Sequence, residues 1–220
     1  MKYVWPSKSS GPNDISSYFF QQLWSIVEPD VTSVVLLVLR SGHCLRKMHH
    51  SHVVLIPNKT NPEYITEYQP ISLGNVVARV VSKVIANRVK TILPSVISNS
   101  QSAFVPTRLI TDNTLVAYEM LHRMQKRQKG KIGHMAVKLN ISKAYDRIEW
   151  NFLKQIMLKI GLPEQWVGLA MKTVQTASYS FLINGEPRGH ITPTHGIKQG
   201  DPLSPYLFFL CAKGLSSLLR

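Results

Sequence analysis

Apolar side chains recur every three or four positions along several stretches of the chain, the spacing that gives a helix one buried face. One stretch covers residues 18–27 and is expected to end near Pro29. A longer one runs from Asn75, a suitable N-cap, to Pro94, which is expected to stop it. Further helices are predicted at residues 112–125, 145–160, 166–174 and 203–219. The last is strongly apolar and is therefore predicted to be buried.

Short apolar runs between these stretches predict strands at residues 53–56, 135–139 and 178–183. The third run precedes Asn184-Gly185, the dipeptide most typical of a two-residue hairpin turn. Residues 31–39 fit either a short buried helix or a strand. Together these elements predict a helix-rich mixed α/β (α+β) domain.

The charge of the chain is strongly unbalanced. Its 220 residues hold 26 Lys and Arg against 12 Asp and Glu, a formal net charge of +14, and 44% are hydrophobic. The hydrophobic fraction is sufficient for a packed core, and the excess of cations favours a polyanionic partner such as nucleic acid. No apolar run reaches the ~20 residues of a membrane-spanning helix, so no membrane partner is expected.

The two cysteines, Cys44 and Cys211, lie far apart in sequence and match no metal-ligand spacing. Their number favours a reducing, intracellular setting, either nucleus or cytoplasm. Several histidines lie close to Cys44, but they too lack a standard zinc spacing and are interpreted as a solvated basic loop. They are His43, His49, His50 and His52.

Five short motifs give the chain a specific resemblance. They are Leu-Ile-Pro at 55–57, Gln-Pro-Ile-Ser-Leu at 69–73, Gln-Ser-Ala-Phe-Val-Pro at 101–106, Leu-Asn-Ile-Ser-Lys-Ala-Tyr-Asp at 139–146 and Gln-Gly-Asp-Pro-Leu-Ser-Pro at 199–205. In this order and spacing they resemble the reverse transcriptase of non-LTR, LINE-type retrotransposons, especially those common in plant genomes. The resemblance covers the chain from about Gly11 to its last residue.

The resemblance implies a right-hand polymerase, with fingers and part of the palm and an incomplete antiparallel palm sheet. Residues 1–10 are then an N-terminal extension, and residues 11–220 are the reverse transcriptase domain. The Asp-Asp hairpin and the thumb of the family are not found in this sequence. Without that hairpin, an apolar face around residues 207–210 is expected to be exposed.

The resemblance also implies a magnesium site, which this sequence alters. In such polymerases two divalent ions about 4 Å apart hold the attacking and leaving oxygens, and Mg²⁺ prefers carboxylate ligands. The family carries Asp where this chain has Asn140, whose amide is neutral and a weaker ligand. No metal ligand is therefore expected to be intact, and Mg²⁺ is not expected to bind productively. Asp146 is expected to cap or enter the next helix instead.

A nucleotide pocket follows from the same comparison. The residues assigned to it are Lys59, Gln69, Arg79, Ile141, Tyr145, Gln199 and Gly200. Tyr145 matches the bulky residue under the sugar that excludes a 2′-hydroxyl, and Gly200 permits close approach of the backbone. Gln69 replaces an arginine that would bind phosphate, and so it cannot supply a charge.

These features predict a fragment of an RNA-directed DNA polymerase that is catalytically inactive. Its expected partners are an RNA template and a DNA primer. An active enzyme would require Asn140 to be tolerated and a second chain to complement the missing motif. The alternatives are a non-catalytic nucleic-acid-binding relic and an interaction module derived from a retroelement.

Overall fold

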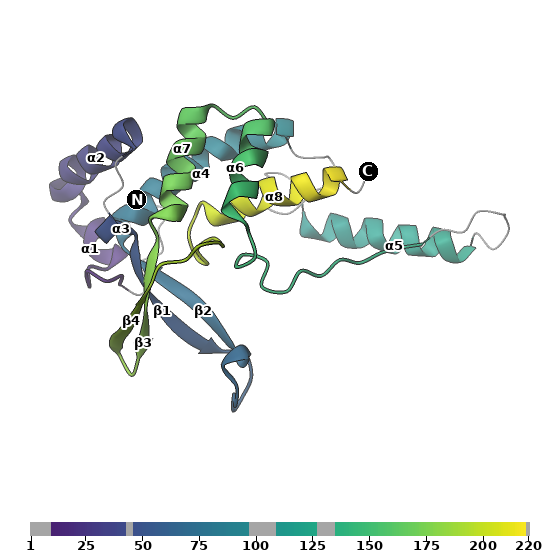
Figure 1. Ribbon diagram of the computed structural model, residues 1–220, viewed down its shortest axis with the longest axis horizontal. Coiled ribbons are helices and arrows are strands. Elements are labelled where there is room, and N and C mark those ends of the chain that lie inside the picture. The colour runs from purple at the N-terminus through teal and green to yellow at the C-terminus, as the bar shows by residue number, and fades with distance from the viewer. Residues whose placement is uncertain (1–9, 43–45, 97–108, 127–134, 219–220) are drawn as a thin grey trace.

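The computed structural model describes residues 10–42, 46–96, 109–126 and 135–218. A body of helices lies above a small sheet that projects from it, and one long helix, α5, extends away to the side (Figure 1). The helices are α1 (Ser17–Gln22), α2 (Trp24–Ser41), α3 (Arg46–His49), α4 (Val76–Val96), α5 (Ile110–Lys126), α6 (Trp150–Lys159), α7 (Glu164–Gln175) and α8 (Ser204–Leu218). The strands are β1 (His50–Pro57), β2 (Tyr68–Gly74), β3 (Ser178–Ile183) and β4 (Glu186–Ile191), and a 3-10 turn spans Ile65–Glu67. The predicted mixture of helices and short strands is confirmed.

The four strands form one sheet in the order β2-β1-β3-β4. The pairs β1–β2 and β3–β4 are antiparallel, whereas β1 and β3 are parallel, with His50 beside Ser178. The turn of the β3–β4 hairpin is Asn184-Gly185, with φ angles of 52° and 83°. Two positive φ angles in succession match the right-handed twist of a hairpin, which is why this dipeptide predicted the turn correctly.

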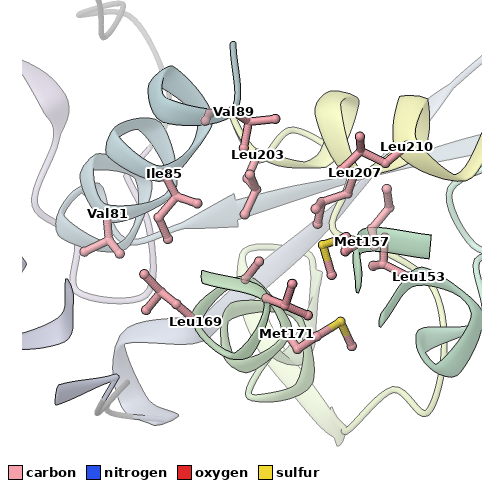
Figure 2. Close-up of a cluster of buried hydrophobic side chains, with 14 of the residues drawn as sticks. Val81, Ile85, Val89, Leu153, Met157, Leu169, Met171, Leu203, Leu207 and Leu210 are labelled. Atoms are coloured by element: carbon pink, nitrogen blue, oxygen red, sulfur yellow. The ribbon is translucent and has the colours of Figure 1, made fainter. Parts of the chain in front are cut away.

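The main core lies between α4, α6, α7 and α8 (Figure 2). Helix α4 contributes Val81, Ile85 and Val89, all fully buried, at the helical spacing seen in the sequence. Helix α6 presents Leu153 and Met157 to the same core. These faces enclose the apolar side of α8, so the sheet itself contributes little to the core.

The predicted exposure of residues 207–210 is wrong. Leu207 and Leu210 are 1% exposed and Phe209 is 5% exposed. They are covered because α8 packs against α4 and α6 rather than against a palm hairpin. Apolar side chains that are open to solvent lie on several other elements, and α5 carries a group of them, including Leu115, Val116, Tyr118 and Leu121.

Two further predictions of elements are wrong. Residues 135–139 form no strand and are exposed, because among the described residues no strand lies beside them to accept their hydrogen bonds. The helix predicted over 145–160 begins only at Trp150, since residues 142–147 form a tight turn. The other late helices, α7 and α8, agree with the prediction within a few residues.

Proline does not end the helices where the sequence suggested. Pro94 lies inside α4, where the nearby carbonyl of Ile92 accepts a hydrogen bond from the Ser95 hydroxyl at 2.7 Å. Pro29 lies inside α2, in its second turn. The actual break comes earlier, at Leu23 (φ −100°, ψ 22°), between α1 and α2. Each proline lacks the backbone N–H of that position and crowds the carbonyl four residues before it, yet both helices continue past their proline.

The histidine-rich segment is not a solvated loop. His49 is 4% exposed, and its Nδ1 lies 3.1 Å from the carbonyl oxygen of Thr173. His50 and His52 belong to β1. His43, Cys44 and the motif at 101–106 lie outside the described residues. No helix in the described part of the chain is both long enough and apolar enough to cross a bilayer.

Candidate nucleotide and nucleic-acid cleft

Two adjoining cavities lie on one face of the sheet, with volumes of about 560 and 340 Å³. Their linings share Pro70, Asp146, Phe181 and Gln199, so they form one cleft. Its floor is built from alternate strand positions, because side chains of a strand point to opposite faces in turn. These positions include Val53 and Leu55 in β1 and Tyr179 and Phe181 in β3.

The wall of the cleft is a turn held against the segment before α8. The amide of Ile197 donates to the carbonyl of Tyr145 at 3.0 Å, and the amide of Gly196 donates to Ile148 at 2.7 Å. The indole Nε1 of Trp150 donates to the carbonyl of Gly196 at 2.7 Å. Gly196 has φ +81°, and a Cβ there would lie 3.1 Å from the carbonyl oxygen of Asp146. Glycine is therefore required for this close approach.

Tyr145 stands between the cleft and the core. Its ring is 5.4 Å from that of Phe208 between centroids, and its side chain is half-buried. Burial raises the pKa of its hydroxyl, so the phenol is neutral at physiological pH. The residue lines the larger cavity, in a position to set the shape of whatever binds there.

Gln199 lines both cavities, and the residues that follow it fix the loop. Gly200 has φ +90° and lies against the backbone of Ser72. The carboxylate of Asp201 accepts hydrogen bonds from the Ser82 hydroxyl at 2.9 Å and from the amide of Leu203 at 2.8 Å. Asp201 thus ties the start of α8 to α4 and holds Gln199 at the cleft.

Lys198 anchors the same loop to the start of β1. Its ammonium donates to the Ser51 hydroxyl at 2.8 Å and to the carbonyl of His49 at 3.2 Å. Burial lowers the pKa of Lys198, while the charge of Asp201 opposes that change. Desolvation, with the negative charges of Asp201 and Asp146, raises the pKa of the neighbouring Tyr179 to about 12.

The cleft brings together three of the residues assigned to the nucleotide pocket: Gln69, Tyr145 and Gln199. In the antiparallel β1–β2 pair, Gln69 lies opposite Ile56, and the next residue, Pro70, lies opposite Leu55, whose side chain forms part of the cleft floor. The pleat therefore directs the side chain of Gln69 to the other face, and its backbone is the part that meets the cavity. Gly200 lies just behind Gln199.

The remaining assigned residues lie elsewhere. The ammonium of Lys59 is paired with Glu67 at 2.6 Å, outside the lining of either cavity. Arg79 lies on α4 with its Nε and one terminal nitrogen buried and without a hydrogen-bond partner, and burial lowers its pKa. Asn140 and Ile141 are exposed on the segment without strand structure and do not line the cleft.

The residues around the cleft do not make a complete magnesium site. Among the described residues, Asp146 is the one carboxylate in the lining of the cleft, and Asp201 already accepts hydrogen bonds from two donors. In the described part of the chain, no three His, Cys, Asp or Glu side chains group as metal ligands. Mg²⁺ usually binds through carboxylates and retained waters, so this donor set does not fit the two-ion site of the resemblance. No step through a metal follows from these residues.

Two features of the cleft are not found by reading the sequence. Asp146 was expected to cap a helix, but α6 begins after Glu149, and Asp146 faces the cleft instead. The predicted cap is therefore wrong, because residues 142–147 turn before the helix starts. Lys198 was overlooked since nothing in a sequence marks a lysine that will be buried. Its position beside the Gln-Gly-Asp-Pro motif is the only available signal.

The chain belongs to the reverse transcriptase (RNA-dependent DNA polymerase) family, whose sequence model matches residues 56–220. Within that family it is a reverse transcriptase domain of the non-LTR retrotransposon type, as its relatives indicate. The transposon TX1 uncharacterized 149 kDa protein of Xenopus laevis is 28% identical over 214 residues, 97% of this chain.

Two further relatives are Pol polyproteins. The retrovirus-related Pol polyprotein from type-1 retrotransposable element R2 of Nasonia vitripennis is 24% identical over 91% of this chain. The protein from type-2 element R2DM of Drosophila melanogaster is 25% identical over 93%. The chain spans only 16%, 19% and 18% of the lengths of these three relatives, in the order given.

Proposed function

We propose that this domain binds the RNA template, DNA primer and incoming nucleotide of reverse transcription in the cleft, without itself carrying out magnesium-dependent synthesis. The observation that supports the proposed binding of nucleic acid and nucleotide is the cleft itself. It joins Tyr145, Gln199 and the backbone of Gln69, residues from three separate motifs, around one cavity of about 560 Å³. A net charge of +14 supports a polyanionic partner.

The loss of catalysis is proposed from the ligand chemistry. Asn140 stands where the resemblance places a carboxylate, and an amide neither balances the charge of two divalent ions nor binds them as strongly. Of the described residues that line the cleft, Asp146 is the single carboxylate.

Primer extension tests the catalytic half. The chain, mixed with an RNA template, a DNA primer, deoxynucleotides and Mg²⁺, is expected to give no extended product. Asn140→Asp alone is also expected to give no extended product, because position 140 lies outside the lining of the cleft. Asn87→Asp, an equal change on the exposed side of α4, is the matched control. Chelator-sensitive extension by the wild-type chain would refute the proposed inactivity.

Nucleotide binding tests the role of Tyr145. The chain bound to primer–template is expected to bind dATP more tightly than ATP, because the ring occupies the space that a 2′-hydroxyl would need. Tyr145→Ala is expected to reduce that preference severalfold, mainly by improving ATP binding. Tyr118→Ala, on exposed α5, controls for loss of an aromatic ring. An unchanged preference in the folded Tyr145→Ala variant, checked by circular dichroism, would show that this side chain is not the determinant.

A further inference from the structure

A third cavity, of about 460 Å³, lies on the face of the sheet opposite the cleft. Its chemically active lining residues are Arg46, Lys47, His50, Ser178, His190 and Thr192. His50 and Ser178 are direct neighbours in the parallel β1–β3 pair and share one face. The floor residues of the cleft, Tyr179 and Val53, point the other way because strand side chains alternate.

The charge around this third cavity has one sign. Arg46 and Lys47 are exposed at its edge, and no carboxylate of the described part of the chain lines it. Burial lowers the pKa of His50, and so do the charges of His52, His190 and Lys198. None of the groups that shift the pKa of His50 is acidic. A group of cations held together without a counter-charge favours binding of an anion.

The histidines are arranged for hydrogen bonding rather than for metal binding. Nδ1 of His50 lies 2.9 Å from the hydroxyl of Ser178, and its Nε2 lies 3.3 Å from that of Ser180. Both ring nitrogens are therefore occupied. The ring of His190 stacks on His50, with centroids 5.6 Å apart and planes at 13°. The stacked imidazoles and the Ser178 hydroxyl thus add polar groups to the same cavity lining as Arg46 and Lys47.

The third cavity and the cleft share one lining residue at the rim of the sheet. Thr192, just after β4, lines both the third cavity and the smaller cavity of the cleft. A chain of phosphates that leaves the cleft past Thr192 would thus arrive beside His190 and then Arg46 and Lys47. The cavity is larger than a single phosphate needs, and it has room for the sugar as well.

We propose that this third cavity is a second nucleic-acid contact, which binds the phosphate backbone of the strand that leaves the cleft. The proposal rests on the proposed function of the cleft, since it extends the path of the same nucleic acid. Arg46 and Lys47 supply the charge, and His190 and Thr192 supply the hydrogen bonds. The contact reads no sequence, because phosphates are the same at every step.

Inorganic phosphate tests the cavity without nucleic acid. In NMR spectra of the imidazole groups, phosphate is expected to shift the signals of His50 and His190. The shifts are expected to be weaker in the Arg46→Gln, Lys47→Gln double variant. The charged and titratable groups around the cavity are Arg46, Lys47, His50, His52, His190 and Lys198. Protonation of the imidazoles adds positive charge, so the affinity for phosphate should rise as the pH falls. Because the pKa of His50 is lowered, the part of this rise that His50 contributes should appear at a pH below the ordinary histidine range. Equal shifts in the double variant would overturn the proposal.

Binding of an RNA–DNA duplex at several salt concentrations tests whether the third cavity contacts the phosphate backbone of the strand. Each lost phosphate contact is expected to reduce the slope of log affinity against log salt by about 0.9. The Arg46→Gln, Lys47→Gln variant should show such a reduction. The Lys154→Gln, Lys159→Gln control removes the same charge from exposed positions on α6 and should keep more of the slope. Equal slopes for the two variants would overturn the second contact, whereas failure of the wild-type chain to bind duplex would overturn the proposed function of the cleft. The wild-type chain could show phosphate-induced NMR shifts while the Arg46→Gln, Lys47→Gln variant keeps the wild-type salt slope. The third cavity would then bind free phosphate only, and this result also overturns the strand contact.

Discussion

Replacing Leu207 by alanine is expected to lower the free energy of unfolding by about 3 kcal/mol, the usual cost of removing a buried leucine side chain and leaving a cavity. Leu207 is 1% exposed on α8 and belongs to the core formed with α4, α6 and α7 (Figure 2). The surrounding side chains come from four helices, so they cannot all move in to fill the space. Urea denaturation followed by circular dichroism measures the change.

The same helix provides the control for this prediction. Leu218 is 79% exposed near the end of α8, and its replacement by alanine is expected to change stability by less than about 0.5 kcal/mol. If Leu207→Ala were as mild as Leu218→Ala, α8 would not pack on the core as described. The exposed palm face predicted from the sequence would then be the better description.

Replacing Gly196 by alanine is expected to cost about 2–4 kcal/mol, from a left-handed backbone and from crowding. Its φ is +81°, and the added Cβ would lie 3.1 Å from the carbonyl oxygen and 3.2 Å from the Cα of Asp146. These are backbone atoms, which cannot rotate away. The turn that carries Tyr145 and Asp146 must therefore separate from the segment that carries Gln199, so nucleic-acid binding is expected to weaken as well.

Gly161 allows the cost of the left-handed backbone to be measured apart from the cost of crowding. It follows α6 with φ +88°, but nothing lies within 4 Å of a Cβ added there. Gly161→Ala is thus expected to cost only the left-handed term, about 1–2 kcal/mol, and to leave nucleic-acid binding unchanged. Thermal unfolding and duplex binding, measured for both variants, check the difference. Equal effects on binding would mean that the contact between residues 196 and 146 does not shape the cleft.

The sequence by itself determined the family and most of the local elements of this protein. Short apolar runs predicted β1 and β3, and helical spacing predicted α4, α5 and α7, because apolar side chains mark the face that an element buries. Asn184-Gly185 determined its hairpin, since few other dipeptides adopt two positive φ angles easily. The motifs at 69–73, 139–146 and 199–205 also identified three of the residues that line the cleft.

Only the tertiary structure decided which residues meet. Residues 135–139 are apolar enough for a strand, yet a strand requires hydrogen bonds from a neighbouring strand. The sequence of the segment does not show whether such a neighbour is present. Asp146 lines the cleft because of bonds between residues 145–148 and 196–197, far apart in sequence. The burial of Leu207 and Lys198, and the gathering of His50 and His190 from different strands, depend likewise on contacts between distant segments. Local propensity acts over a few residues, whereas these sites are set by packing across the whole domain.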